Sequence, residues 1–269
     1  MPEGDSIHSA ARRVGAALVG RPIVAIETPQ LRHSLDRWPE RLDGRSVRSV
    51  DARGKHLFIR FEGDLTLHSH LRMTGYWGVY RRGERWRRSA RRAWLVLRTE
   101  QHDVVEFDGP VVELMTDSRT RFDRRLTRLG PDILGEELDE RRFLELVRRG
   151  DQTRAVGDAL LDQRNVAGIG NIWKNEGCFI ASVSPWRRVR DVSDEQALAI
   201  VRGIRPLMQA SAERGGRITT FDGPAERNEW RTWVHERAGM PCRRCKTRIR
   251  SRGQGEDNRN TFWCPGCQR

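Results

Sequence analysis

The chain has 269 residues, and its 50 lysines and arginines exceed its 37 aspartates and glutamates, which gives a formal net charge of +13 and a pI near 10.8. This length suits two modest domains, since domains commonly have about 100 to 150 residues, and the charge favours a polyanionic partner, with nucleic acid ahead of a membrane surface or an acidic protein. No apolar run approaches the ~18 residues that span a bilayer and the start lacks a signal-peptide pattern, so we expect a cytoplasmic protein without membrane contacts.

The first part of the chain predicts one helix followed by strands. Apolar residues spaced by three and four over positions 5–18 indicate an amphipathic helix, whose start Asp5 or Ser6 can cap. From position 23 to 107, short alternating segments broken by polar turns indicate an antiparallel β-sheet domain. The arginine cluster RRGERWRRSARR within this domain is more typical of solvated surface than of a targeting signal. A general preference of the proteome for arginine is an alternative explanation of the net charge.

After Gly130-Pro131 the pattern returns to helices. Four segments have helical periodicity, at positions 138–149, 155–166, 171–181 and 193–214. Positions 214–240 show no clear period and indicate a loop. We therefore predict a domain over 1–130, a second over 131–240 that includes this loop, and a cysteine-bearing module over 241–269.

Four of the five cysteines form two Cys-x-x-Cys pairs near the end of the chain. Cys242 and Cys245 are separated by 18 residues from Cys264 and Cys267. Four thiolates give Zn²⁺ a closed tetrahedral shell, so we predict one structural zinc ion that holds a β-hairpin, with a redox pair or chance as alternatives. Cys178 stands alone in a predicted helix and is expected to be a buried structural thiol.

A Gly-x-Gly-Asn turn joins two predicted helices within LLDQRNVAGIGNIWKNE. Backbone N–H groups at Gly168, Gly170 and Asn171 can approach a phosphate at the positive end of the following helix. A plain packing corner is the alternative. The Asn171 amide favours the phosphate interpretation, because it can bind a phosphate oxygen as well as cap the helix.

Two isolated cations have a functional and an ordinary interpretation. Lys55 follows a glycine and enters an apolar strand, where it is either solvated or a phosphate-binding or acid–base group. Arg259 lies between the cysteine pairs, where it is either a surface residue or a guanidinium aimed at one phosphate.

These features occur together in one known family. The segments MPEG, RGKHL, SHLRMTG, LGPDIL, LLDQ…VAGIGNI…E and RNTFWCPGCQ, in this order from residue 2 to 268, resemble the formamidopyrimidine-DNA glycosylase and endonuclease VIII family of base-excision repair enzymes. The resemblance implies an α+β fold: an N-terminal helix with a β-sandwich, then a helix-two-turns-helix domain with a C-terminal zinc finger β-hairpin, and DNA in the cleft between them.

The resemblance also assigns the chemistry. It implies that Pro2, once Met1 is removed, attacks C1′ of a damaged nucleotide as a secondary amine, since α-amino groups titrate at a pH of about 8. Glu3 then protonates the sugar ring oxygen. By the same resemblance, Lys55 assists the β-elimination and Arg259 assists the δ-elimination, and each binds a flanking phosphate.

The same resemblance implies DNA contacts. Arg72 and Arg128 match DNA-contacting positions, where a guanidinium suits a phosphate, and Asn171 matches a phosphate-binding turn. Met73 matches the position that fills the gap left by the flipped base, and Glu176 matches an acid near the nucleophile.

Three departures bear on specificity. The segment DSRTRFDRRLTRLGPDIL lacks the compact loop of the formamidopyrimidine branch, and the segment after RGGRITTF is short, so endonuclease VIII and oxidised pyrimidines are favoured. Position 6, acidic in many relatives, is Ser6.

We therefore expect a monomeric, bifunctional DNA glycosylase and abasic-site lyase that acts on double- or single-stranded DNA in the bacterial cytoplasm, at the nucleoid, with no diffusible cofactor. A zinc-ribbon protein that binds damaged or abasic DNA without cutting it is the main alternative. An RNA-binding or ribosomal zinc protein is a third, but it has no need of Pro2, Glu3, Lys55 and Arg259 together.

Overall fold

The computed structural model describes residues 2–30, 36–215, 218–221 and 231–269. The chain divides into two compact units. Unit 1 comprises residues 1–2 and 6–127, and unit 2 comprises residues 3–5 and 128–269. Among the described residues, no helix combines the length and apolar character needed to cross a bilayer.

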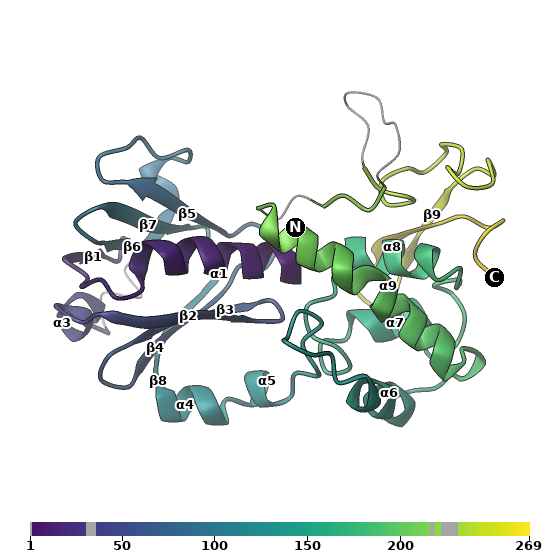
Figure 1. Cartoon of the computed structure of the whole chain (residues 1–269), viewed down its shortest axis with the longest axis horizontal. Coiled ribbons are helices and arrows are strands. Elements are labelled where there is room, and N and C mark those ends of the chain that lie inside the picture. Colours follow the sequence, from purple (N-terminus) through teal and green to yellow (C-terminus); the bar gives the residue numbers. More distant parts are fainter. Residues whose placement is uncertain (1, 31–35, 216–217, 222–230) are drawn as a thin grey trace. The chain divides into compact units, whose positions relative to one another are not determined.

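Unit 1 contains most of helix α1 and two four-stranded antiparallel sheets. Figure 1 labels these elements. Helix α1 begins at Gly4, so Asp5 and Ser6 lie in its first turn and the prediction that either one caps it is wrong. One sheet has the order β1-β6-β7-β5 and the other β2-β3-β4-β8. The bounds are α1 Gly4–Leu18, β1 Ala25–Glu27, β2 Val47–Arg53, β3 His56–Phe61, β4 Leu65–His70, β5 Tyr76–Arg81, β6 Ala93–Arg98, β7 His102–Phe107 and β8 Val111–Thr116.

The core of unit 1 follows from the alternation of residues along these strands. Apolar side chains from α1 and from both sheets form one buried cluster, which includes Val14, Leu57, Ile59, Trp77 and Leu97. Burying them is the main stabilising contribution, about 25 cal/mol per Å² of apolar surface. The short helices of the unit are α3 Trp38–Leu42, α4 Asp117–Phe122 and α5 Arg124–Thr127, with the 3-10 turn η1 Ala90–Arg92.

Unit 2 is helical around a second buried cluster. Its helices are α6 Glu140–Arg149, α7 Val156–Leu161, α8 Asn171–Ile180 and α9 Asp194–Glu213, with the 3-10 turn η2 Val189–Asp191. Three of the four predicted segments are helices with nearly the expected bounds. Helix α7 is shorter than predicted, because after Leu161 the side chain of Gln163 donates hydrogen bonds to the carbonyls of Leu161 and Ile169 and holds the chain in a turn.

A two-stranded antiparallel hairpin closes unit 2. Strands β9 Arg250–Gln254 and β10 Arg259–Trp263 lie between the two cysteine pairs, as predicted. Strand β10 packs against α8, where the N–H of Phe262 donates to Asn175 Oδ1 at 3.3 Å. Part of the predicted loop at 214–240 lies outside the described residues, and its described parts contain no helix beyond Arg214 and no strand.

Candidate active site

Glu3 lies against the first turn of α8, within unit 2. Its carboxylate is fully buried and accepts hydrogen bonds from the N–H groups of Ile172 (2.9 Å) and Trp173 (3.3 Å). These N–H groups have no partner inside the helix and carry its positive partial charge, so the ionised carboxylate is favoured there. The sequence identified Glu3 but not the group that fixes it.

The glycines of the Gly-x-Gly turn leave the space in which Glu3 reaches the start of α8. A Cβ added to Gly170 would collide with the Glu3 carboxylate, and one added to Gly4 would lie 2.9 Å from the Gly168 Cα. The N–H of Gly168 donates to Gln163 Oε1 at 3.0 Å. The N–H groups of Gly168, Ile172 and Trp173 thus already have acceptors within the chain, and the predicted phosphate site at this turn stays a prediction for the N–H groups of Gly170 and Asn171.

Asn171 is the first residue of α8 rather than its cap, so the predicted capping role is wrong. Its Nδ2 donates to the carbonyl of Asn260 on β10 at 2.9 Å, which joins the start of α8 to the hairpin. Its buried Oδ1 has no hydrogen-bond partner among the described residues. Asn171 therefore sets where the neighbouring Arg259 is held.

Arg259 is the first residue of β10, and about a third of its side chain is exposed. It forms an ion pair with Asp257 at 3.0 Å, and the Asp257 side chain is 73% exposed. Such exposed pairs are worth roughly 0–1 kcal/mol, so a phosphate can replace Asp257 with little loss. Arg259 also lines a cavity of about 510 Å³ together with Gln254, Asp158 and neighbouring residues.

Lys174 is a buried cation on α8 that the sequence interpretation missed. Its Nζ donates to the side chains of Thr261 and Gln254 on the hairpin, the latter at 3.3 Å. Burial lowers the Lys174 pKa from 10.5 to about 8, against the opposing effects of the nearby Cys178 and Asp158. Lys174 lies one turn after Asn171, on the face of α8 that meets the hairpin, and no spacing in the sequence reveals that contact.

Replacing Lys174 by methionine should raise the free energy of unfolding at pH 7 by about 1–3 kcal/mol, because a buried charge gives way to an apolar chain of similar length. Thr261 keeps Gln254 as its partner at 2.7 Å. The pKa of Lys174 is lower in the folded protein than in the unfolded chain. Below pH 8 the ammonium is charged in both states, and its burial costs the full free energy of roughly 3 kcal/mol. This cost disappears as the pH rises to 10.5. Urea titrations across this window should show the difference between variant and wild type shrinking, whereas Lys246→Met, at an exposed lysine, should show no such trend.

Glu176 is fully buried and organises the segment before the first cysteine pair. It accepts hydrogen bonds from the N–H groups of Trp233 (2.7 Å), Val234 (3.0 Å) and His235 (2.9 Å), and from the hydroxyl of Thr220. Both carboxylate oxygens thus hold this segment, and the predicted DNA contact of Glu176 stays a prediction. Glu176 is a positioning residue for this segment.

Glu176→Ala should lower the free energy of unfolding by about 3–5 kcal/mol, because several buried donors lose their acceptor at about 1–3 kcal/mol each. Hydrogen exchange should accelerate at the amides of Trp233, Val234 and His235. Equal protection of these amides in the variant and the wild type would contradict this role.

The four sulfurs of Cys242, Cys245, Cys264 and Cys267 lie within 4.8 Å of one another, so this cluster can hold a metal ion. The Sγ atoms of Cys242 and Cys267 are 3.9 Å apart, and those of Cys245 and Cys264 are 3.4 Å apart. A tetrahedral shell with Zn–S bonds of about 2.3 Å requires sulfurs about 3.8 Å apart, so the cluster fits zinc. Cys178 is fully buried outside the cluster, and burial raises its pKa to about 12.

Lys55 lies in unit 1, in the two-residue turn between β2 and β3. Gly54 has φ +58°, the left-handed conformation that tight hairpin turns need, and this turn presents Lys55 beside β4. Lys55 and Arg72 both lie near His70. Burial lowers the His70 pKa to about 4, and these two cations contribute to the shift, so the ring is neutral at pH 7.

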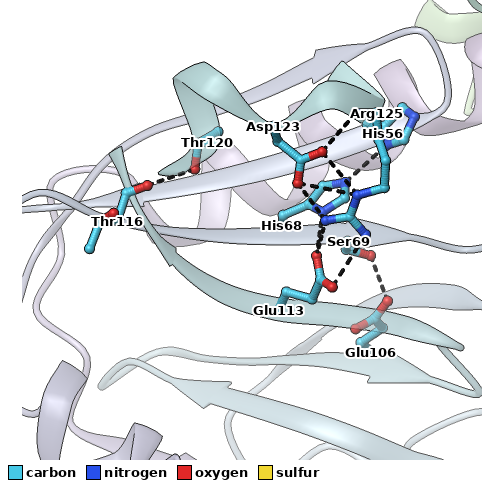
Figure 2. Close-up of polar contacts among 9 residues, drawn as sticks. All are labelled: His56, His68, Ser69, Glu106, Glu113, Thr116, Thr120, Asp123 and Arg125. Carbon is cyan, nitrogen blue, oxygen red and sulfur yellow. Dashed lines mark hydrogen bonds and ion pairs between the residues drawn. The ribbon is translucent and has the colours of Figure 1, made fainter. Parts of the chain in front are cut away.

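A polar network that includes His56, the residue after Lys55, joins the sheet to α4 and α5 (Figure 2). His56 Nδ1 and His68 Nε2 are 2.8 Å apart, and His68 Nδ1 is 3.4 Å from Glu113. Arg125 contacts both Glu113 and Asp123 at 2.6 Å. The sequence interpretation missed this network, although the HSH stretch in an apolar strand was a signal. It fixes the strand residue that follows Lys55.

Three predicted DNA-contacting side chains are exposed. Met73 is 64% exposed in the turn that follows β4, and Arg72 before it has φ +48°. Arg128 is exposed after α5. Pro2 is half-buried, and its nitrogen is joined to Met1. Lys55 and Arg72 thus lie together in unit 1, while Glu3, Asn171 and the hairpin with Arg259 lie together in unit 2.

The chain matches two family models. Residues 1–121 match the formamidopyrimidine-DNA glycosylase N-terminal domain, and residues 129–222 match the formamidopyrimidine-DNA glycosylase H2TH domain.

Curated relatives match along the whole chain. A probable endonuclease 8 2 of Streptomyces coelicolor is 40% identical over 271 residues, covering 100% of this chain and 94% of the relative. The DNA-(apurinic or apyrimidinic site) lyase Nei2 of Mycolicibacterium smegmatis is 36% identical and covers 100% and 99%. A solved complex of a Lactococcus lactis FPG mutant with Fapy-dG containing DNA has a TM-score of 0.83 at 24% identity, with full coverage of both chains.

Proposed function

The chain belongs to the formamidopyrimidine-DNA glycosylase and endonuclease VIII family, and on this premise we propose how its residues perform the reaction. It is a DNA glycosylase with abasic-site lyase activity in base-excision repair, and its substrate is DNA with damaged bases or abasic sites. We assign oxidised pyrimidines as the favoured lesions, in keeping with the endonuclease 8 names of its relatives.

The reaction begins at Pro2 after Met1 is removed. The Pro2 nitrogen bonds to C1′ of the deoxyribose as the bond between C1′ and the base breaks, and the departing base takes a proton from water. The Glu3 carboxylate then accepts the proton that the Pro2 nitrogen still carries and passes it to the ring oxygen. The bond between that oxygen and C1′ breaks, and the adduct becomes an iminium ion. The adjacent, buried carboxylate of Glu3, held by the first turn of α8, is the observation that carries this proposal.

Strand cleavage follows from the acidity of the iminium. Loss of a C2′ proton breaks the C3′–O bond and releases one strand end, and a second elimination breaks the C5′–O bond; water then hydrolyses the imine and frees Pro2. Lys55 and Arg259 assist these eliminations and hold phosphates. Met73 fills the space of the flipped nucleotide.

The remaining contacts hold the strand and the hairpin. Arg72 and Arg128 bind phosphates, and Asn171 orients the hairpin that carries Arg259. One structural Zn²⁺ bound by the four clustered cysteines stabilises that hairpin, and no diffusible cofactor takes part.

We propose domains at 1–130, 131–240 and 241–269 and a monomeric enzyme. The curated relatives named above are bacterial, and bacterial genomic DNA lies in the cytoplasm, so this reaction belongs there, at the nucleoid.

Borohydride reduction tests the proposal. Protein shown by mass spectrometry to begin at Pro2 should form a covalent complex with abasic DNA in the presence of borohydride, because reduction traps the imine. Protein that keeps Met1 is the matched control and should form none.

The alternative is a zinc-ribbon protein that binds damaged DNA without cutting it. It predicts tight, salt-sensitive binding by both preparations and no covalent complex in either.

A further inference from the structure

The arginine loop, residues 81–92 between β5 and β6, is a surface to which the proposed reaction assigns no role. It contains seven arginines and one glutamate. Despite its exposure, it is anchored at Trp86. The Trp86 ring lies 5.9 Å from Phe107 and 6.4 Å from Tyr80, and its Nε1 donates to Asp103 at 3.3 Å. The loop is therefore held against the sheet by an aromatic cluster.

Two aspartates near the loop already have ion-pair partners, and the loop's own Glu84 accepts a hydrogen bond from the Arg81 N–H at 3.0 Å. Asp108 forms ion pairs with Arg88 (2.9 Å) and Arg92 (2.7 Å). Asp103 forms ion pairs with Arg82 at 3.5 Å and Arg98 at 3.4 Å.

Three further arginines of the loop have no such compensation. Arg85, Arg87 and Arg91 are exposed, and within the described part of the chain their guanidinium groups have neither an ion pair nor a hydrogen bond. Arg85 and Arg87, with the other residues from Gly83 to Ala90 and with Asp103, line a cavity of about 650 Å³. Three uncompensated guanidinium groups on an anchored loop form a site for a polyanion.

The contacts of Arg88 favour DNA as that polyanion. Arg88 Nη1 donates to the carbonyl of Thr74 at 3.1 Å, and its guanidinium lies 5.0 Å from the centre of the Tyr76 ring. Thr74 directly follows Met73, so the loop is bonded to the same turn that enters the base stack in the proposed reaction. If Met73 enters the base stack at the lesion, the flanking duplex therefore lies close to the arginine loop.

We propose that the arginine loop binds the phosphate backbone of duplex DNA beside the lesion, through Arg85, Arg87 and Arg91. This inference rests on the proposed function, because it takes the lesion to be seated at Met73. It makes flanking duplex, rather than a single-stranded lesion alone, part of the substrate.

The test measures the salt dependence of binding. With the full chain and a duplex that contains an uncleavable abasic analogue, R85Q/R87Q/R91Q should reduce the slope of log K against log salt by about 2.7, which is about 0.9 for each lost phosphate contact. R141Q/R142Q/R149Q removes the same charge from exposed positions of α6 and should leave the slope unchanged. Both variants should keep the wild-type melting temperature, because the side chains replaced are on the surface.

Shortened DNA locates the contact. Trimming the duplex on one side of the lesion should abolish the difference between R85Q/R87Q/R91Q and wild type, whereas trimming the other side should preserve it. On a single strand that ends at the lesion, the two proteins should have equal slopes.

An unchanged slope in R85Q/R87Q/R91Q, or an equal fall in the α6 control, would overturn the inference. If the variant instead loses affinity for a polyglutamate peptide while its duplex slope stays the same, the loop is a docking site for an acidic protein and the inference is wrong. These outcomes are separable from failure of the proposed function, since borohydride trapping by the wild type tests Pro2 alone and binding to the analogue needs no chemistry.

Discussion

Replacing Glu3 by glutamine should slow base removal by about 10²- to 10⁴-fold, the usual contribution of a general acid in the transition state. The amide cannot supply the proton that opens the sugar ring. Cleavage at a pre-formed abasic site should fall far less, because such a site already equilibrates with an open-chain aldehyde that Pro2 can attack directly. Gel assays on a damaged base and on an abasic site, with the same sequence, give the two rates.

The control for Glu3→Gln must account for the hydrogen bonds that Glu3 accepts at the start of α8, which also affect stability. Glutamine keeps one oxygen acceptor but loses the charge, which should cost about 1–2 kcal/mol of stability. Glu176→Gln makes the same change at another buried carboxylate of unit 2, one that accepts from Trp233, Val234 and His235 rather than from the start of α8, and should leave the ratio of the two rates unchanged. If cleavage at the abasic site falls as far as base removal in Glu3→Gln, the assignment of Glu3 as the ring-opening acid is wrong.

Loss of the metal from the four-cysteine cluster should abolish strand cleavage. Structural zinc contributes about 10–16 kcal/mol of apparent binding free energy, so a chelator or Cys264→Ser should unfold the hairpin. Arg259 would then lose its fixed position, and Lys174 would lose Thr261 and Gln254. Zinc release measured with a colorimetric chelator, beside cleavage of abasic DNA, checks this result.

Cys178→Ser is the matched control for the metal experiment. Cys178 is buried in the same unit but outside the cluster, so its variant should keep one zinc per chain and its cleavage activity. Full cleavage by a Cys264→Ser protein that contains no zinc would show that the metal does not hold the hairpin in its active form.

Local patterns predicted many of the elements correctly. The spacing of apolar residues indicated α1, α6, α8 and α9, and the two cysteine pairs indicated the β9–β10 hairpin. The predicted end of α7 was wrong. The apolar spacing continues to Val166, but hydrogen bonds from the Gln163 side chain hold the chain in a turn after Leu161. Helix α4 was missed although Thr116 caps it by accepting from the Arg119 N–H, which is a recognisable signal.

The site was predicted in its residue types but not in its connections. Family resemblance pointed to Glu3, yet no local rule reveals that its partner is the N–H of Ile172. The resemblance also placed Glu176 with the DNA contacts, but it did not show that the Glu176 oxygens hold the segment around Val234. Buried Lys174 was missed for the same reason, because contacts between residues far apart in the chain leave no periodic pattern.

The hydrogen bonds of Glu3 also set the order in which the enzyme is completed during synthesis. Glu3 is among the first residues to leave the ribosome, but its donors at Ile172 and Trp173 follow about 170 positions later, and Ser211, which donates to Asp5 at 2.5 Å, later still. Domains generally fold from the N-terminus as they emerge, so most of unit 1 can form before these partners exist. The carboxylate beside Pro2 is thus fixed only late in translation, and a chain that stops before α8 has the amine without its positioned acid.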